Sequence, residues 1–189
     1  INAIEHQLAG NRNMREDVLD KLVTSIGLDR NLFTPVDSIH GKFASMPKET
    51  SEELMQFLGY LLGDGIVNGR SVRFKDADES LLAQYNKLCH KLFGISGRVV
   101  KIPEANAHLL EINSKAVCDW LRLNFRELTL RKSQKGIPPI VGRTSAREVN
   151  GFLRGLYDAE GCVNIKSGQV SLRMMSGRTV RTAQMLLLR

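Results

Sequence analysis

The sequence has little of what a disulfide framework, a zinc site or a membrane span needs. Its three cysteines, Cys89, Cys118 and Cys162, lie far apart and form no Cys-x-x-Cys pair, so we expect small buried hydrophobic residues rather than bridges or metal ligands. No apolar run approaches the roughly 20 residues of a membrane helix, and residues 1–13 contain no apolar signal-peptide core. We therefore expect an intracellular protein without a membrane partner, in the cytoplasm or at the nucleoid.

Acidic residues are fewer than basic residues in this chain. Lys and Arg total 27 residues against 20 for Asp and Glu, which gives a net charge of +7. Such an excess favours a polyanionic partner, although a solvated basic surface on a protein indifferent to nucleic acid would have the same composition. Hydrophobic residues make up 42% of the chain, which is enough for one or two compact units with a real core.

Two segments far apart in the sequence share one design. The first, from Thr50 to Gly65, begins with the capping-box spacing of Thr50 and Glu53, continues with apolar residues at helical intervals and ends at a glycine. The second repeats this order, with Ser145 and Glu148 as the box and Gly161 as the stop. Each segment is therefore predicted to be a buried helix with a defined start and end.

A hairpin is predicted after each of these helices. Residues 66–75 contain an Asn68-Gly69 turn between short strand-like runs, and residues 163–174 contain Ser167-Gly168 at the corresponding place. Polar and apolar residues alternate along the second strand of each hairpin, which buries one face of the sheet and leaves the other polar and basic.

The remaining pattern sets the expected domain limits. A helix over 77–93, strands over 98–102 and 108–113 and a helix over 114–124 complete the first half, whereas the second half reaches only its second helix, 178–189. We therefore expect an N-terminal appendage of unknown role at 1–50, with an amphipathic helix over 15–26, and a first repeat at 51–125. An exposed basic linker at 126–144 and a truncated second repeat at 145–189 follow.

Asp64 and Glu160 stand in the last turn of the two repeated helices, where the helix dipole disfavours an acid. Gly59 and Gly63 in one helix, and Gly155 and Ala159 in the other, form ridges without side chains that allow two backbones to pack closely. Such packing would bring the two acids within a few ångströms of each other, a conflict that a divalent cation such as Mg²⁺ resolves. The alternative is a glycine-capped buried helix with a chance acidic residue.

The segments FLGYLLGDG and LRGLYDAEG resemble the two signature motifs of LAGLIDADG homing endonucleases, particularly the two-motif archaeal, intein-borne (DOD) type. The resemblance covers residues 51–189. It implies an α+β fold in which αββαββα units repeat about a pseudo-two-fold axis and form a β-saddle for the DNA major groove. A pseudo-symmetric monomer is expected if the second repeat is complete.

By alignment of these motifs, the resemblance makes Asp64 and Glu160 the catalytic metal ligands, with the backbone carbonyls of Gly63 and Ala159 assisting. Mg²⁺ is the expected cofactor, and Mn²⁺ can substitute for it. The first motif departs from the family pattern because Leu62 stands where the second has Asp158; that position is structural in the family, so activity is not put in doubt.

The family also places a basic residue near the scissile phosphate. Lys115, just after the fourth strand, and Lys101 are the candidates, and the spacing does not choose between them. For each of these lysines the alternative is a side chain that touches only solvent.

The resemblance predicts a site-specific enzyme that hydrolyses both strands of duplex DNA, with the endonuclease domain of an intein as one setting. A non-cleaving DNA- or RNA-binding regulator or maturase on the same fold is the alternative, and retention of both acids favours the enzyme. The residues expected to contact base edges or phosphates are Asn68, Arg70, Ser71, Arg73, Lys75, Arg98, Asn164, Lys166, Gln169, Ser171 and Arg173, with Arg131, Lys132 and Lys135 of the linker.

Overall fold

The computed structural model describes residues 24–25 and 44–188 of the chain. The expected N-terminal appendage, with its helix over 15–26, therefore lies mostly outside the described residues and stays a prediction. Within the described part, no helix is long and apolar enough to cross a membrane.

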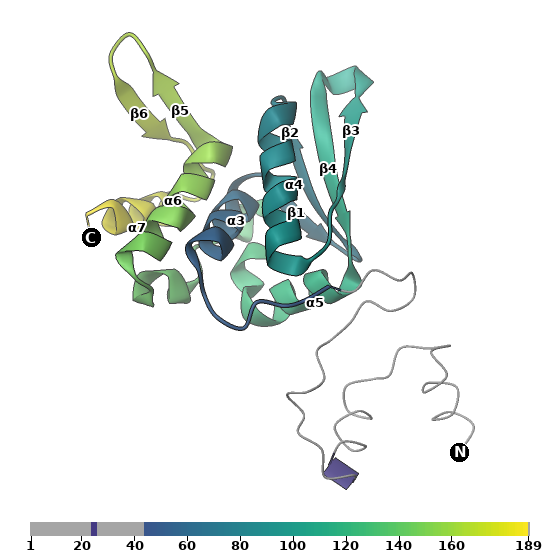
Figure 1. Cartoon of the computed structure of the whole chain (residues 1–189). Coiled ribbons are helices and arrows are strands. Elements are labelled where there is room, and N and C mark those ends of the chain that lie inside the picture. Colours follow the sequence, from purple (N-terminus) through teal and green to yellow (C-terminus); the bar gives the residue numbers. More distant parts are fainter. Residues whose placement is uncertain (1–23, 26–43, 189) are drawn as a thin grey trace.

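The first half of the chain folds into a complete αββαββα unit (Figure 1). Its four strands form one antiparallel sheet in the order β1-β2-β4-β3. The predicted α+β fold is thereby confirmed, and the elements of this unit are α3 (Glu52–Gly63), β1 (Gly65–Asn68), β2 (Ser71–Asp76), α4 (Glu79–Phe93), β3 (Arg98–Ile102), β4 (Ala107–Asn113) and α5 (Lys115–Asn124).

The second half repeats the first four elements of this order. Helix α6 (Ala146–Glu160) is followed by the hairpin of β5 (Gly161–Asn164) and β6 (Gln169–Leu172), and then by α7 (Gly177–Leu187). Figure 1 shows the β5–β6 hairpin and the four-stranded sheet on opposite sides of the α3–α6 pair, as two repeats related by a pseudo-two-fold axis would place them.

Local chemistry explains where these elements begin and turn. Helix α6 has the predicted capping box of Ser145 and Glu148, but α3 begins one residue later than expected, because the Ser51 hydroxyl, not Thr50, accepts the hydrogen bond from the Leu54 amide. Gly69 and Gly168 both adopt positive φ angles at the hairpin turns, a conformation that glycine adopts without steric cost.

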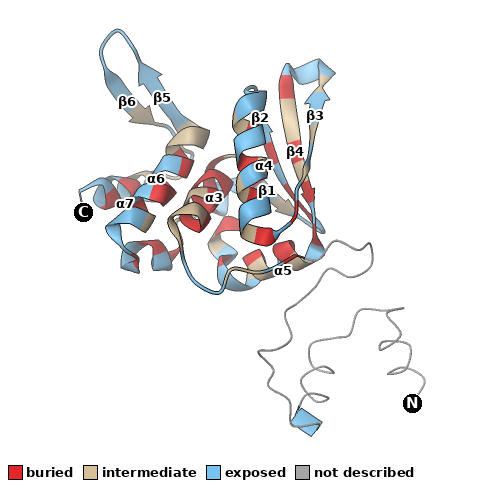
Figure 2. Cartoon of the chain, viewed as in Figure 1, coloured by how far each residue is buried: buried red, intermediate tan, exposed pale blue. Residues whose placement is uncertain are grey.

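The core surrounds α3, which is buried along both sides. One side packs against α6, and the other meets the sheet through Phe57 and Tyr60, whose rings contact Phe74 of β2. Figure 2 shows this helix almost entirely buried, while the outer side of α4 is exposed. The sheet thus has one face against the helices and one face open.

The segment between the repeats is largely exposed, as its composition predicts, but a few buried residues anchor it to the core. It contains three short 3₁₀ turns, Arg126–Leu128, Lys132–Gln134 and Pro139–Arg143. Leu128 and Val141 are fully buried in the common core, so they hold this segment against the ends of the two motif helices. Burial of two apolar anchors outweighs the tendency of a basic stretch to stay in solvent.

The β5–β6 hairpin is covered much less than the hairpin of the first repeat. Its apolar residues Val163 and Val170 are 63% and 57% exposed, and Figure 2 shows the hairpin largely exposed. The prediction of three buried cysteines holds for Cys89 and Cys118 but is wrong for Cys162, because Cys162 lies on this open hairpin.

Candidate acidic site and nucleic-acid-facing surface

The two motif helices touch backbone to backbone. A Cβ atom added to Gly59 would overlap the carbonyl oxygen of Phe152, and one added to Gly155 would overlap that of Gln56. The close approach predicted from the small residues is therefore present. Gly151 extends the contact, since a Cβ there would overlap the carbonyl oxygen of Glu52; its spacing of four residues from Gly155 was the sequence signal for this role.

The same packing brings the C-terminal ends of the helices together. Gly63 lies against Ala159, and a Cβ added to Gly63 would also come within 2.9 Å of Cγ of Glu160. Asp64 and Glu160, which follow these two residues, face a common point. That point holds the ammonium of Lys132, whose Nζ lies 3.2 Å from Oε1 of Glu160 and 3.7 Å from Oδ1 of Asp64.

The pair of acids perturbs the titration of the site. Burial, and then the negative charge of Glu160, raise the pKa of Asp64 from 3.8 to about 6, while the charge of Lys132 acts in the opposite direction. Burial lowers the pKa of Lys132, but the hydrogen bond to Glu160 and the charges of both acids outweigh it and raise that pKa above its ordinary value. The lysine therefore stays protonated between the two carboxylates.

Lys135 occupies a different position from the one expected of a DNA contact. Its side chain is only 6% exposed, and its ammonium donates to the carbonyl oxygens of Leu61 and Gly65 at the end of α3. These bonds satisfy acceptors that a helix end leaves free. Burial and the charge of Lys132 lower the pKa of Lys135 to about 8. Because its ammonium is enclosed, Lys135 binds the backbone on either side of Asp64 and is not free to contact DNA.

The structure brings neither predicted catalytic lysine to the acids. Lys115 pairs with Asp119 in the first turn of α5 and follows the end of β4 at which Asn113 pairs with Ser71, about 10 Å along β2 from the end next to Asp64. Lys101 lies on β3, three strands and about 14 Å from β1, opposite His108.

A cleft opens beside the acids and carries much of the local positive charge. Its volume is about 460 Å³. Lys132, Arg131 and Lys75 reach it from two directions, the first two from the segment between the repeats and the third from β2. The lining residues are Gly63, Asp64, Gly65, Ile66, Val67, Lys75, Leu130, Arg131, Lys132 and Lys135.

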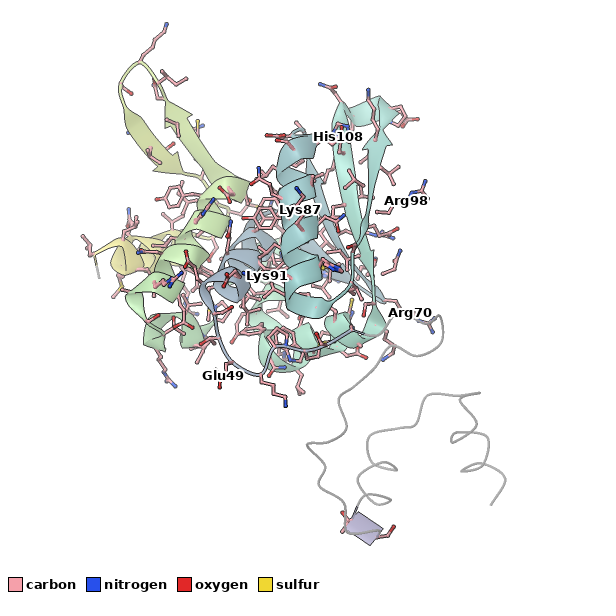
Figure 3. The ribbon with its side chains drawn as sticks, in the orientation of Figure 1. Glu49, Arg70, Lys87, Lys91, Arg98 and His108 are labelled. Carbon is pink, nitrogen blue, oxygen red and sulfur yellow. The ribbon has the colours of Figure 1, made fainter. Side chains whose placement is uncertain are left out.

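The strand register places most of the expected nucleic-acid contacts of the first repeat on the open face of the sheet. Arg73 of β2 pairs with Glu111 of β4 and donates a hydrogen bond to its carboxylate. Arg98 of β3, the other neighbour of β4, pairs with the same glutamate. Figure 3 shows Arg98 and Arg70 projecting outward, away from the helices. Arg73 and Lys75 alternate with buried Val72 and Phe74 and are exposed on this face, as is Asn68 of β1. Ser71 shares the face but is only 5% exposed, so the prediction that it contacts DNA is not supported.

The expected contacts of the second repeat lie on and around its hairpin. Asn164 pairs with Gln169 and Ser171 with Cys162, so these side chains share one face. Lys166 is in the turn, where the side chain of Asn164 accepts from its amide. Arg173 follows β6, and its amide lies 3.4 Å from the carbonyl oxygen of Glu160. The two repeats therefore present polar and basic side chains on either side of the acids.

The donor set fits a magnesium ion shared with a phosphate. No group of three or more His, Cys, Asp or Glu side chains among the described residues is placed to hold a metal. The acidic site therefore offers two carboxylates, those of Asp64 and Glu160, which share the ammonium of Lys132. Mg²⁺ characteristically binds one or two protein carboxylates and fills its other positions with water and phosphate oxygens, so the residues present are suited to it.

Comparison with known proteins agrees with this architecture. The model of the LAGLIDADG-like domain matches residues 51–123 and 147–189, which include both motif helices and their acids. The chain belongs to the LAGLIDADG family.

The most similar proteins differ widely in what their names describe. One is glutamine–fructose-6-phosphate aminotransferase (isomerizing) of Methanocaldococcus jannaschii, 34% identical over 94% of this chain and 16% of that protein. Another belongs to the A-type ATP synthase of Pyrococcus abyssi and is 30% identical over 72% of this chain and 13% of the relative. The replicative DNA helicase DnaB of Rhodothermus marinus is 28% identical over 77% of this chain and 17% of the helicase. The chain spans less than a fifth of each.

Proposed function

We propose that this chain is a site-specific homing endonuclease that hydrolyses one phosphodiester bond on each strand of duplex DNA. One observation carries the proposal: the motif helices pack so closely that Asp64 and Glu160, from different repeats, both reach the ammonium of Lys132. A site that holds one cation between two acids and opens into a basic cleft is suited to a divalent ion and a phosphate.

Each part of the site has a distinct role in this proposal. The carboxylates of Asp64 and Glu160, with the backbone carbonyls of Gly63 and Ala159, would hold Mg²⁺ or Mn²⁺, which when bound lowers the pKa of water and stabilises the leaving oxygen. Lys132 would turn from the acids to the phosphate and offset its charge. Because each acid belongs to one repeat, each lies nearer to one of the two scissile bonds.

The open faces of the two repeats would position the duplex. Basic side chains such as Lys75 and Arg131 flank Asp64 and suit phosphate oxygens. Polar side chains such as Asn68 and Gln169 lie at the hairpin ends, where amide groups can pair with base edges. This division leaves recognition to the hairpins and chemistry to the helix ends.

We further propose that the chain is the endonuclease part of an intein. An aminotransferase, an ATP synthase component and a helicase have no activity in common, yet each shares with this chain a segment that covers less than a fifth of its length. Recurrence within proteins of unrelated function is typical of an inserted element rather than of a domain serving its host. The hosts' activities are accordingly not expected of this chain.

A second candidate is a DNA-binding protein on the same fold that does not cut. The observation that favours it is again Lys132, whose single ammonium already pairs with both acids and offsets one of their two negative charges. In that case the acids and the lysine would form a structural ion pair between the repeats. The two candidates differ in whether Mg²⁺ displaces the lysine and in whether DNA is cut.

The deciding experiment selects bound sites from a randomised duplex library and places the best of them in a supercoiled plasmid. We expect the chain to linearise this plasmid with Mg²⁺ and not with EDTA. Asp64→Asn keeps the side-chain volume but removes metal charge, so it should bind within about tenfold of wild type and leave both strands intact. Binding without cleavage by the wild-type chain would favour the second candidate, and linearisation by Asp64→Asn at the wild-type rate would disprove the site.

A further inference from the structure

A polar contact joins the two repeats two residues before Glu160. The carboxylate of Asp158 on α6 accepts a hydrogen bond of 2.7 Å from the Tyr85 hydroxyl on α4 and one of 3.5 Å from the side-chain amide of Gln56 on α3. Both donors belong to the first repeat and the acceptor to the second. The last turn of α6 is therefore attached to the first repeat through its side chains as well as its backbone.

The first repeat holds Tyr85 rigidly in place. The tyrosine is 2% exposed, and its ring stacks on that of Tyr60 with centroids 3.8 Å apart and an interplanar angle of 13°. The Tyr60 hydroxyl itself donates a 2.8 Å hydrogen bond to Asp76 at the end of β2, within the first repeat and without contact to Asp158. Because a stacked, buried pair has little freedom to turn, the donor to Asp158 has a fixed position relative to the sheet.

The pseudo-symmetric position in the other half has no such polar pair. The N-cap residues Asp78 and Ser176 align α4 with α7, which places Ala183 at the position of Tyr85. Alignment of Asp64 with Glu160 places Leu62 at the position of Asp158. Ala183 and Leu62 are both buried and apolar. Instead, the end of α3 is held by the Lys135 ammonium on its carbonyl oxygens.

We propose that Tyr85 and Asp158 are positioning residues that fix the last turn of α6, and with it Glu160, relative to Asp64. The inference rests on the proposed endonuclease function and deepens it. Since the polar pair holds one helix end only, its loss should displace Glu160 more than Asp64. One of the two strand cuts should then slow more than the other.

The test compares Tyr85→Phe with Tyr60→Phe on a supercoiled plasmid that carries the selected site. Each variant loses one buried tyrosine hydroxyl and keeps its ring, but only the Tyr85 hydroxyl crosses between the repeats. A small displacement of a reacting group lowers rates steeply, so Tyr85→Phe should slow the second cut about tenfold and accumulate nicked circles. DNA affinity should stay within about twofold, since the hydroxyl is remote from the open sheet face.

A double variant separates positioning from stability. Tyr85→Phe with Asp158→Leu replaces the polar pair by an apolar one like that of the other half, which removes the half-buried carboxylate that Tyr85→Phe alone deprives of its tyrosine donor. We expect a melting temperature within a few degrees of wild type and continued accumulation of nicked circles. If this double variant linearised the plasmid as wild type does, the pair would serve stability alone and the proposal would be wrong.

The remaining outcomes are equally informative. Equal nicking by Tyr60→Phe would assign the effect to general loosening of the core and overturn the role of the Tyr85–Asp158 contact. Cleavage by wild type and Tyr85→Phe at the same rates and ratios would overturn this inference while leaving the proposed function intact. A wild-type chain that binds its site but cuts neither strand would instead overturn the proposed function, and the positioning of Glu160 with it.

Discussion

Lys132 is the cation that pairs with both carboxylates of the acidic site. Asp64 is held by burial and by Glu160 at a pKa of about 6, and the ammonium of Lys132 keeps that value from rising further. In the unfolded chain the carboxyl has its ordinary pKa of 3.8. Between about pH 4 and 6 the folded chain thus retains a proton that the unfolded chain has lost, so the contribution of Asp64 to stability falls as pH rises through this window.

Magnesium should therefore stabilise the chain in a pH-dependent manner. If Mg²⁺ binds the deprotonated acids as proposed, its effect on the melting temperature should be small at about pH 5 and should reach its full size above pH 6 to 7. Lys132→Met should move the midpoint of this profile to higher pH, because the positive charge that lowers the pKa of Asp64 is gone. Thermal unfolding with and without Mg²⁺ across this pH range measures the wild-type profile and the shift of its midpoint in Lys132→Met.

Two variants calibrate that profile. Asp64→Asn should lose most of the Mg²⁺-dependent shift at every pH, because one of the two carboxylates is absent. Lys91→Met should leave the midpoint unchanged, since Lys91 pairs with Glu53 on the helix side of the molecule. An unchanged midpoint in Lys132→Met would mean that its ammonium does not act on the acids in solution.

At the residue scale, the sequence predicted that the two acids lie close together, but it did not predict the positions of the lysines around them. Asp64 and Glu160 end two helices of the same design, so the repeat alone brings them together. Lys132 and Lys135 lie about 70 residues from Asp64 in sequence, in a segment without helical or strand periodicity. Their positions depend on where buried Leu128 and Val141 hold that segment, and no local pattern encodes this tertiary path.

The contact between α3 and α6 is the element on which the site depends. Gly59→Ala adds one methyl group, which would raise helix propensity by up to about 1 kcal/mol on a solvated face. At Gly59 that methyl group meets the backbone of Phe152, and overpacking of this kind costs about 1 to 3 kcal/mol or more. We therefore expect a net loss of stability, measured as a lower melting temperature, together with slower cleavage because the helix ends separate.

Gly177→Ala is the matched control for this prediction. Gly177 opens α7, and a Cβ atom there would meet nothing within 4 Å. The same substitution should leave stability unchanged or slightly higher at this position. If Gly59→Ala raised the melting temperature as Gly177→Ala does, the two motif helices would not be in backbone contact, and the shared acidic site would lose its geometric basis.

Helices, hairpins and the helix contact could all be predicted because each has a local signature. Capping residues, apolar stripes, Asn-Gly and Ser-Gly turns and small residues four apart act over a few residues, and the resulting elements follow the expected order. The errors arose where two neighbouring residues could take the same role, or where burial depends on packing between distant segments. Ser51 rather than Thr50 caps α3 because its hydroxyl reaches the Leu54 amide, and Cys162 is exposed because little covers its hairpin.

The whole molecule combines a net charge of +7 with an uneven placement of that charge. One face of the four-stranded sheet is buried by α3 and α4, so its basic strand residues can only lie on the other face. The Tyr85–Asp158 contact and the α3–α6 backbone contact join α6, the helix before the second hairpin, to the first repeat. The chain thus presents positive charge on the same side as its acidic site.

Duplex DNA on this surface should bind with a strong dependence on salt. A protein that neutralises several phosphates releases about one counterion for each, so affinity should fall about a thousandfold or more between roughly 50 and 200 mM salt if six or more phosphates are contacted. Lys75→Gln should reduce the slope of log K against log salt by about 1, because Lys75 lies on the open face beside Asp64. Fluorescence anisotropy with a labelled duplex measures both slopes.

Lys91→Gln tests whether the slope reports this face or merely the total charge. It removes the same unit of charge as Lys75→Gln, but Lys91 lies on α4, where Figure 3 shows it on the helix side of the molecule. Screened charges act over a Debye length of about 10 Å at 0.1 M salt, so a lysine on the far side should leave the slope unchanged. Equal effects of the two substitutions would indicate diffuse attraction by net charge, and a loss of affinity below about threefold over the whole salt range would exclude DNA held on this saddle.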